Sequence, residues 1–369
     1  MRRRHLELIL DLTSTCNIRC VMCYFSTTDQ LRFKPYDLDA GSMGNMELTV
    51  FHHLASELFS HAHTIGLGCS AEPLLHPEFS KILHISREHR VPKIWLQTNL
   101  LALSDAKAHA IVEHGVQTVA VSIDGTTKET YERIRAGASW DRLHSRLELL
   151  RRTGGSASRS RPRLRITFAW MRSNREELKS LPAFASSIGA REIDVRFVAP
   201  TVGLDNRDEL LNDAEPDELM DELWMVARDA TSRGIRLSAY PAMKRERDAD
   251  NSVIGKIQRR VWLLKSGIDG PARWRRSVLD RFAGCSFPGR MLLIRPNGAV
   301  LPCPFWEQEP IAVIPRDNSR AILESVGLER IRTGLQNGCP VSSCQTCDAR
   351  KDALFRPIFS TGKGATETN

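Results

Sequence analysis

The chain has 369 residues, of which 41% are hydrophobic and 26% charged, and its formal net charge is +8. This composition excludes a disordered protein, a collagen-like repeat and a small disulfide-stabilised scaffold. No apolar run reaches the roughly 18–20 residues of a membrane span, and no cleavage site follows the basic start, so we expect a cytoplasmic protein. The arginine-rich charge is compatible with an anionic substrate, because arginine binds carboxylate and phosphate groups bidentately.

Short apolar runs alternate with longer helical patterns through the first 240 residues. Strands are expected at 6–12, 64–68, 93–98, 117–122, 163–170, 192–198 and, more briefly, 235–239. Helices are expected at 46–59, 79–90, 105–114, 128–152, 175–187 and 217–233. This alternation predicts an α/β fold with a parallel sheet. Right-handed crossovers would curl six strands into a partial (β/α)6 TIM-type barrel, with the functional loops at the carboxyl ends of the strands.

The chain divides into four predicted segments. Residues 1–240 form the barrel, and residues 241–283 are a basic bridge with helical patterns. Residues 284–350 form a small unit with five of the nine cysteines, and the polar tail 351–369 is expected to be flexible.

The cysteines carry the strongest signal. In a chain without an export signal, clustered cysteines indicate metal binding rather than disulfides. Cys16, Cys20 and Cys23 have the spacing C-x3-C-x2-C directly after the first predicted strand. Three thiolates on one short loop can hold three irons of a [4Fe–4S] cluster and leave the fourth iron open to a small chelating molecule. A zinc site would need a fourth ligand close by.

This motif and its place after the first strand resemble the radical S-adenosylmethionine (radical SAM) superfamily. The resemblance implies that Cys16, Cys20 and Cys23 ligate a [4Fe–4S] cluster whose open iron binds SAM. One electron then cleaves SAM to methionine and a 5′-deoxyadenosyl radical, which abstracts a substrate hydrogen. An external electron donor such as flavodoxin or ferredoxin would be a partner.

Further motifs of the same family follow the next predicted strands. The run Ser-Ala-Glu-Pro at 70–73 stands where the family usually has Gly-Gly-Glu-Pro, and Thr-Asn-Leu at 98–100 stands where Thr-Asn-Gly is common. Ser-Ile-Asp-Gly at 122–125 and the run 131–135 are also typical of the family. The resemblance implies that the SAM contacts are Met22, Ser70, Ala71, Glu72, Asn99, Ser122 and Asp124.

The second cysteine group begins with Cys285 and Cys303, which flank a predicted hairpin with its turn at 296–298, and continues with Cys344 and Cys347. Alone, this arrangement could hold structural zinc. Behind such a barrel it resembles the SPASM or twitch region, as in the twitch dehydrogenase of butirosin biosynthesis. That resemblance implies one auxiliary [4Fe–4S] cluster on these four thiols. Cys339 is expected to pack as a small hydrophobe, with replacement of one of the four ligands as the alternative.

Other candidates concern the substrate. Cys69 is either a buried thiol at a strand end or a donor of a hydrogen atom to a substrate radical, the catalytic role proposed for it. Substrate contacts are expected from inward-facing residues of the late strands and the C-terminal unit: Trp170, Arg172, Arg196, Tyr240 and Trp306.

These observations predict a radical SAM enzyme, an oxidoreductase, epimerase or lyase, acting on a small polar metabolite. A sugar, aminocyclitol or nucleoside in natural-product (antibiotic) biosynthesis would fit, with dehydrogenation, epimerisation, dehydration or decarboxylation as outcomes. Because the chain enters the barrel at once, no leader-peptide-binding domain is expected. A SPASM-type enzyme that modifies a ribosomal precursor peptide is the alternative. A non-catalytic zinc or nucleic-acid-binding protein is a third hypothesis, disfavoured because the basic residues form no recognisable RNA-binding module. No membrane partner is expected.

Overall fold

The computed structural model describes residues 6–23, 44–154, 161–198, 206–211, 214, 216–240, 285, 287–306, 308–345 and 347. The predicted bridge at 241–283 and the predicted tail at 351–369 lie outside these ranges.

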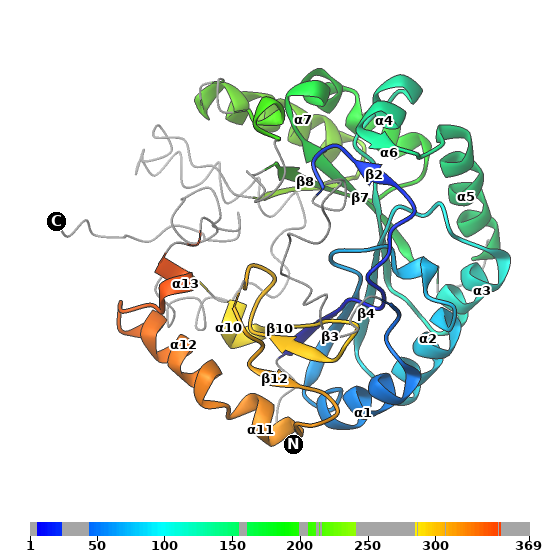
Figure 1. The fold of residues 1–369 in the computed structure, drawn as a ribbon. Coiled ribbons are helices and arrows are strands. Elements are labelled where there is room, and N and C mark those ends of the chain that lie inside the picture. Colours follow the sequence, from blue (N-terminus) through cyan, green and yellow to red (C-terminus); the bar gives the residue numbers. More distant parts are fainter. Residues whose placement is uncertain are drawn as a thin grey trace.

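A curved parallel sheet forms the barrel. Its strands are β1 (Leu6–Leu10), β3 (Ala62–Leu67), β4 (Lys93–Thr98), β5 (Thr118–Ser122), β7 (Arg163–Trp170), β8 (Glu192–Phe197) and β9 (Arg236–Tyr240). Each strand pairs in parallel with the next in this order. The sheet wraps around one side of the molecule in Figure 1. This architecture confirms the predicted α/β partial TIM-type barrel.

Helices cover the outer face of the curved sheet, as Figure 1 shows. They are α1 (Leu48–Leu58), α2 (Phe79–Glu88), α3 (Asp105–Glu113), α4 (Lys128–Ile134), α5 (Trp140–Thr153), α6 (Leu181–Ser187) and α7 (Pro216–Ser232). Polar caps fix where several of them begin: the Ser104 hydroxyl accepts the N–H of Lys107 in α3, and the Ser139 hydroxyl accepts that of Arg142 in α5. Alternate apolar strand residues and the helix residues beneath them form one large buried core.

Two predicted helices are each divided in the structure. The predicted helix 128–152 is interrupted by β6 (Arg135–Ala136) and by Gly137, whose φ of 89° is left-handed, before the Ser139 cap starts α5. The predicted helix 175–187 is a 3-10 helix, η4 (Arg172–Lys179), followed by α6, in whose first turn Pro182 lies. Proline is favoured in a first helical turn because its missing N–H has no partner to lose there.

The remaining barrel elements are short. They are β2 (Arg19–Cys20), η3 (Pro73–Leu75) and η5 (Arg207–Glu209). β2 pairs antiparallel with β6, which ties the first cysteine loop to the end of α4 (Figure 1).

The inner face of the barrel is largely polar. Because strand side chains alternate between faces, residues paired across parallel strands share a side. Gln97 of β4 donates to the Ser122 hydroxyl at 2.7 Å and accepts from Thr167 of β7 at 3.2 Å. In the same row as Thr167, Ser238 of β9 donates to Asp194 of β8 at 3.0 Å. This polar lining is suited to a polar molecule.

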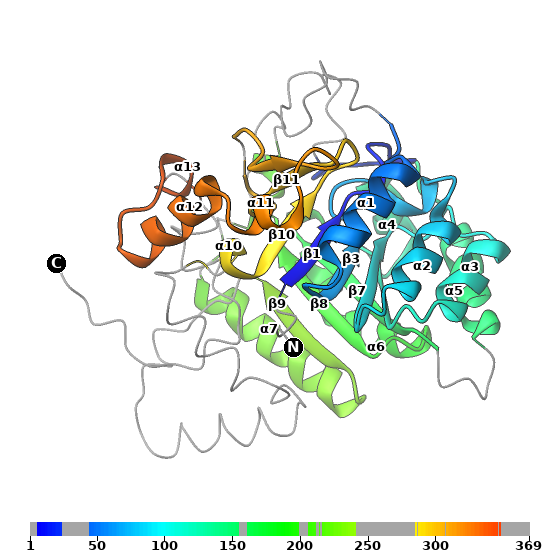
Figure 2. The ribbon, with the colours of Figure 1, turned by 90° about the horizontal axis from the view of Figure 1, so that it is seen from below.

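The C-terminal unit extends the same sheet. Its elements are α10 (Phe287–Arg290), β10 (Met291–Ile294), β11 (Ala299–Leu301), β12 (Ala312–Val313), α11 (Ser319–Leu323), α12 (Val326–Gln336) and α13 (Ser342–Gln345). The predicted hairpin is β10–β11, but β10 also pairs in parallel with β1, which the sequence did not predict. Figure 2 shows β10 beside β1. Together the described strands make one ten-stranded sheet.

The hairpin turn depends on Gly298. Its φ is 82°, and a Cβ atom there would lie 2.0 Å from the carbonyl oxygen of Ile314. Only glycine therefore fits where the residue after β12 passes the turn. Among the described helices, none has the length and apolar character needed to cross a membrane.

Candidate cysteine-rich active site

Cys16, Cys20 and Cys23 lie on the loop after β1, at the carboxyl end of the barrel strands, and all three are half-buried. The Cys23 N–H donates to the Cys20 carbonyl at 3.0 Å, which folds the end of the loop back on itself. Burial raises the pKa of the Cys20 thiol to about 12, Arg135 opposes this rise, and negative charge on Cys16 or Cys23 adds to it. The three thiols are therefore close enough to interact, as the ligands of one cluster must be.

The chemistry of these donors distinguishes two kinds of metal site. Within the described ranges, no three His, Cys, Asp or Glu side chains lie close enough to share a single metal ion. A structural zinc ion takes four protein ligands. A [4Fe–4S] cluster takes one thiolate for each iron, so three cysteines on one short loop can hold three of its irons and leave the fourth open. The donor set is that of such a cluster.

Glu72 joins two loops at the mouth of the barrel. Its carboxylate is buried and accepts the N–H of Leu74 at 3.0 Å, the hydroxyl of Thr98 at 2.6 Å and the N–H of Asn99 at 2.6 Å. Burial raises the pKa of Glu72, and these hydrogen bonds oppose the rise. The Asn99 amide in turn donates to Asn17 at 2.8 Å, beside Cys16. Glu72 thus fixes the loop that carries Asn99 against the cysteine loop.

Asp11 performs a similar role for the loop after β3. Its carboxylate accepts the N–H groups of Cys69 at 2.9 Å and Ser70 at 3.0 Å. The Cys69 side chain is exposed among the described residues, yet surrounding protein atoms and the Asp11 charge raise its pKa to about 12, against an opposing effect of Arg196. The positive charge of Arg196 therefore acts on the Cys69 thiol.

Asp124, at the end of β5, is fully buried. Its carboxylate accepts the N–H of Ala169 at 2.7 Å and forms an ion pair with Arg135 at 2.6 Å. Burial raises the pKa of Asp124, whereas Arg135 and the hydrogen bond from Ala169 lower it. Arg135 also donates to the Cys20 sulfur at 3.7 Å, so this buried pair reaches the cysteine loop.

The family model for the radical SAM superfamily matches residues 10–160, which run from the end of β1 to the segment after α5. This part of the chain is therefore similar to radical SAM domains. The match includes the three loop cysteines and each of the buried carboxylates described above.

Two curated relatives agree with this assignment. The AdoMet-dependent heme synthase of Methanosarcina barkeri (strain Fusaro / DSM 804) is 26% identical over 201 residues, which are 54% of this chain and 52% of the relative. The tungsten-containing aldehyde ferredoxin oxidoreductase cofactor-modifying protein of Pyrococcus furiosus is 24% identical over 251 residues, 66% of this chain and 65% of the relative. The chain thus spans between about half and two thirds of the relatives' length.

A solved structure shares the fold. The crystal structure of Streptococcus suis SuiB bound to S-adenosylmethionine superposes with a TM-score of 0.61 at 13% sequence identity, covering 95% of this chain and 72% of SuiB. This likeness supports the partial-barrel architecture of the radical SAM domain and its C-terminal extension.

The structure places the predicted SAM contacts around the domain's cysteine loop. Met22, Ser70 and Ala71 are half-buried on their loops, and Asn99 and Ser122 lie at the ends of β4 and β5. Their roles toward SAM stay predictions. The carboxylates of Glu72 and Asp124 are bonded to the protein's own loops.

The structure places the predicted substrate residues in different parts of the fold, and only some of them face the barrel interior. Trp170 is fully buried on the outer face of β7, with its ring 5.0 Å from that of Phe197, so it does not reach the barrel interior. Trp306 packs in the apolar core of the C-terminal unit, and its N–H donates to the Glu309 carbonyl at 2.9 Å. Arg196 lies on the inner face.

The other two predicted substrate residues are Arg172 and Tyr240. Arg172 is exposed at the start of η4. Tyr240 ends β9, but its side chain lies outside the described part of the structure.

The second cysteine group also converges. Burial raises the pKa of the Cys303 thiol, and negative charge on Cys285, Cys347 and Cys344 adds to the rise. Cys285, Cys303 and Cys344 pack against an apolar cluster that includes Leu301. Cys339 is exposed rather than packed as predicted. The charges that act on Cys303 are thus those of the other three predicted ligands, and their role as a ligand set stays a prediction.

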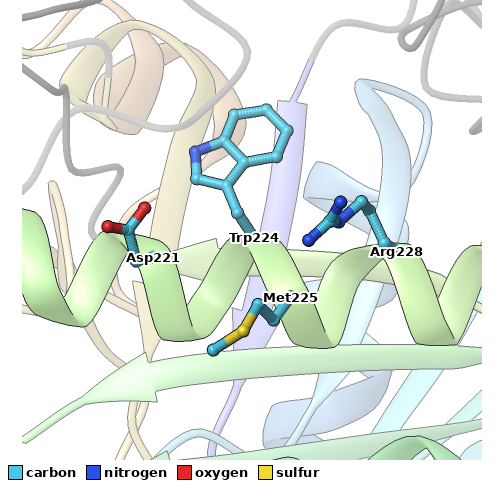
Figure 3. A pocket seen from close by; sticks show the side chains of 4 residues that line it. All are labelled: Asp221, Trp224, Met225 and Arg228. Carbon is cyan, nitrogen blue, oxygen red and sulfur yellow. The ribbon is translucent and has the colours of Figure 1, made fainter.

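A hollow of about 550 Å³ lies on α7, lined by Asp221, Trp224, Met225 and Arg228. In Figure 3, Trp224 and Arg228 project from the same side of the helix, as side chains four residues apart should. No residue of the radical SAM domain lines it, so we assign it no role in the chemistry.

The sequence did not indicate a role for Arg135 or Asp11, although both contact the site residues. Arg135 lies in the family-like run 131–135, which was noted without a role for its arginine. Asp11 interrupts an apolar strand just before the first cysteine. A carboxylate at that point could have indicated a role in holding a loop of the site.

Proposed function

We propose that the protein is a radical SAM enzyme acting on a small polar metabolite, such as a sugar, an aminocyclitol or a nucleoside. The observation that carries this proposal is the cysteine loop of the domain at the mouth of a barrel with a polar inner face. Cys16, Cys20 and Cys23 would hold a [4Fe–4S] cluster. When bound, that cluster supplies the electron that cleaves SAM to the 5′-deoxyadenosyl radical.

Five side chains or loop segments would contact SAM directly. Met22, Ser70, Ala71, Asn99 and Ser122 lie on loops or strand ends around the cysteine loop, and Ser70 and Asn99 are held by bonded backbone N–H groups. Because every oxygen of Glu72 already accepts a protein hydrogen bond, we propose that this residue shapes the loop rather than meeting SAM through its carboxylate.

Asp124 would act in the same indirect way. Its carboxylate is fully buried and bonded to Ala169 and Arg135, so we propose that it orders the end of β5 beside Ser122. Ser122 itself bonds Gln97 and remains half-buried on the inner face.

Charge on the inner face supports a substrate with an anionic group. The Arg196 guanidinium is about half exposed (52%), and Asp194, which is only 15% exposed, holds it at 2.9 Å. A guanidinium oriented by one carboxylate can still bind a carboxylate or phosphate through its remaining N–H groups. We propose Arg196 as the main substrate contact, with Arg172 and Tyr240 as further candidates.

An auxiliary [4Fe–4S] cluster on Cys285, Cys303, Cys344 and Cys347 is the second part of the proposal. Such a cluster would supply an acceptor for one electron. A substrate radical at an alcohol carbon that loses one electron and its hydroxyl proton becomes a carbonyl, so the net reaction is a dehydrogenation. We propose that the enzyme works in the cytoplasm with an external donor such as flavodoxin or ferredoxin.

Cys69 offers a different outcome of the same radical. In an epimerisation its S–H bond would break as a new C–H bond forms on the opposite face of the substrate carbon. The thiyl radical left on Cys69 would then need one electron and one proton, with the auxiliary cluster as the electron source. Its exposed thiol just after the end of β3 supports this role. Cys69→Ala should abolish incorporation of solvent deuterium into product, and unchanged incorporation would remove the role.

Metal analysis of anaerobically purified protein tests the cluster assignment. About eight irons and eight sulfides per chain are expected for two [4Fe–4S] clusters. Cys344→Ala should remove about half of each, and Cys339→Ala, the matched control, should remove none. Zinc in place of iron would overturn the proposal.

Turnover tests the function itself. With dithionite and SAM, the protein should form 5′-deoxyadenosine, and Cys16→Ala should lose this activity while Cys339→Ala keeps it. Small anionic sugars, aminocyclitols and nucleosides should then stimulate the reaction. Stimulation by a short peptide instead would favour the alternative of a peptide-modifying enzyme.

A further inference from the structure

A buried ion pair lies directly behind one of the three loop cysteines. The Arg135 Nη2 atom is 2.6 Å from the Asp124 Oδ2 atom, and the two side chains are only 8% and 1% exposed. The other terminal nitrogen of Arg135, Nη1, donates to the Cys20 sulfur at 3.7 Å. One guanidinium therefore connects a buried carboxylate with a predicted cluster ligand.

The backbone holds this contact in register. Cys20 of β2 pairs directly opposite Arg135 of β6, and the next residue, Val21, donates its N–H to the Ile134 carbonyl at 2.9 Å. The side-chain contact and the two-stranded ladder thus join the same two segments twice. A change at Arg135 would act on Cys20 without passing through any other part of the loop.

Asp124 is fixed independently of Arg135. The Ala169 N–H donates to its carboxylate at 2.7 Å, and the Asn174 amide donates to its backbone carbonyl at 2.9 Å. These bonds attach the anion to the ends of β5 and β7 and to η4. The carboxylate therefore provides a fixed point against which the guanidinium is oriented.

A contribution to stability alone does not account for this ion pair. Arg135 Nε and the nearby Tyr131 hydroxyl are both buried and make no hydrogen bond within the described structure. A buried ion pair repays its desolvation only when its remaining polar atoms are also satisfied. A role beyond folding accounts better for its position next to a thiolate.

Electrostatics indicates what that role is. Reduction adds one negative charge to an iron–sulfur cluster, and hydrogen bonds to the cysteine sulfurs are among the factors that set its potential. A cation that donates to a ligating sulfur stabilises the reduced form. A nearby carboxylate opposes this effect, and both effects are strong where water is excluded.

We propose that Arg135 is a positioning residue that orients Cys20 and raises the reduction potential of the cluster, and that Asp124 holds Arg135 and limits its effect. This inference rests on the proposed function, because the cluster at the three loop cysteines must be present.

Redox titration followed by electron paramagnetic resonance tests the proposal. The titration follows only the cluster signal that changes when SAM is added, so an auxiliary cluster does not interfere. Arg135→Gln should make reduction less favourable by at least threefold, about 28 mV at 59 mV per tenfold for one electron. Asp124→Asn should shift the potential in the opposite direction by a smaller factor, because Asp124 reaches Cys20 only through Arg135.

Arg133→Gln is the matched control. Arg133 lies two residues away, donates to the Ser173 carbonyl at 2.9 Å in an exposed position, and carries the same charge. Its variant should leave the potential unchanged. Shifts of the same sign in Arg135→Gln and Asp124→Asn, or no shift in either, would overturn the proposal.

The double variant and the SAM-responsive signal of the wild-type protein complete the test. If a single variant fails to fold, the double variant Asp124→Asn with Arg135→Gln removes both buried charges at nearly constant volume. It should bind iron normally and show a lowered potential, because Arg135 is the partner that contacts Cys20, whereas a wild-type potential would refute the role. Wild-type protein without a SAM-responsive cluster signal would overturn the proposed function as well, whereas a normal signal with unmoved potentials would overturn this inference alone.

Discussion

Leu100 has an unusual backbone conformation beside Asn99, which bonds the cysteine loop. Its replacement by glycine has two opposing effects on stability. Its φ of 68° is left-handed, and its side chain is fully buried. The turn is fixed by the Thr98 hydroxyl, which accepts the Leu100 N–H at 2.8 Å. Glycine is common here in the family, so Leu100→Gly would restore the familiar motif.

The magnitudes predict that this change is harmful. Relief of the left-handed conformation is worth roughly 1–2 kcal/mol. Removal of a buried leucine side chain costs about 3–5 kcal/mol in measured Leu→Ala series. The greater chain entropy of glycine in the unfolded state adds about 0.5–1 kcal/mol. We therefore expect Leu100→Gly to lower the free energy of unfolding by about 2–4 kcal/mol.

Urea unfolding monitored by circular dichroism measures this difference. Arg90→Gly is the control, because Arg90 has a similar φ of 52° but an exposed side chain. That variant should be neutral or more stable by up to about 1 kcal/mol. A Leu100→Gly protein as stable as the wild type would refute the reasoning, since backbone strain would then outweigh burial.

Three further predictions follow from contacts at the site and its supports. Asp11→Ala leaves the N–H groups of Cys69 and Ser70 without their acceptor and should cost about 2–4 kcal/mol, with weaker SAM binding in a binding titration. Burial would raise the pKa of Glu192, but its arginine partners lower it overall from the usual 4.5, so its stabilising effect should be present above pH 4.5 and decline below. Glu192→Gln should therefore be less stable at neutral pH, by a margin that narrows as the pH falls. Gly298→Ala should cost about 2–4 kcal/mol in urea unfolding, because it adds both a left-handed alanine and a backbone clash.

Each of these predictions has its own control. Asp11→Asn keeps an acceptor oxygen and should lose less than Asp11→Ala, so an equal loss would contradict the hydrogen-bond argument. A constant gap between wild type and Glu192→Gln from pH 7 to pH 3 would contradict the assigned titration. Gly338 has a similar φ of 72° with nothing within 4 Å of an added Cβ, so Gly338→Ala should cost only the backbone part.

Much of the barrel could be predicted from local pattern. The strands at 93–98 and 163–170 have the predicted bounds, because polar and turn residues flank each apolar run. The prediction of one continuous helix at 128–152 was wrong, because Gly137 and the Ser139 cap divide it into two. The first cysteine loop was found because its three thiols are consecutive in a short motif.

Long-range pairing could not be predicted in this way. Nothing local indicates that Ile294 pairs with Leu10, since that contact depends on how the whole sheet is assembled. Sequence also does not tell whether a carboxylate faces a ligand or its own loop. Glu72 and Asp124 were identified by motif, but their buried hydrogen bonds are visible only in the structure.

The parallel pairing of β10 with β1 has a consequence for synthesis of the chain. Leu10 and its partner Ile294 are 284 residues apart, so β1 remains an edge strand until the chain has been made beyond residue 294. Exposed edge strands favour pairing with other chains, and contacts of such sequence separation form late in folding. The loop that would carry the cluster leaves this same strand. Cluster insertion is therefore expected to follow completion of the chain, which makes the nascent barrel dependent on protection from aggregation until its C-terminal strands arrive.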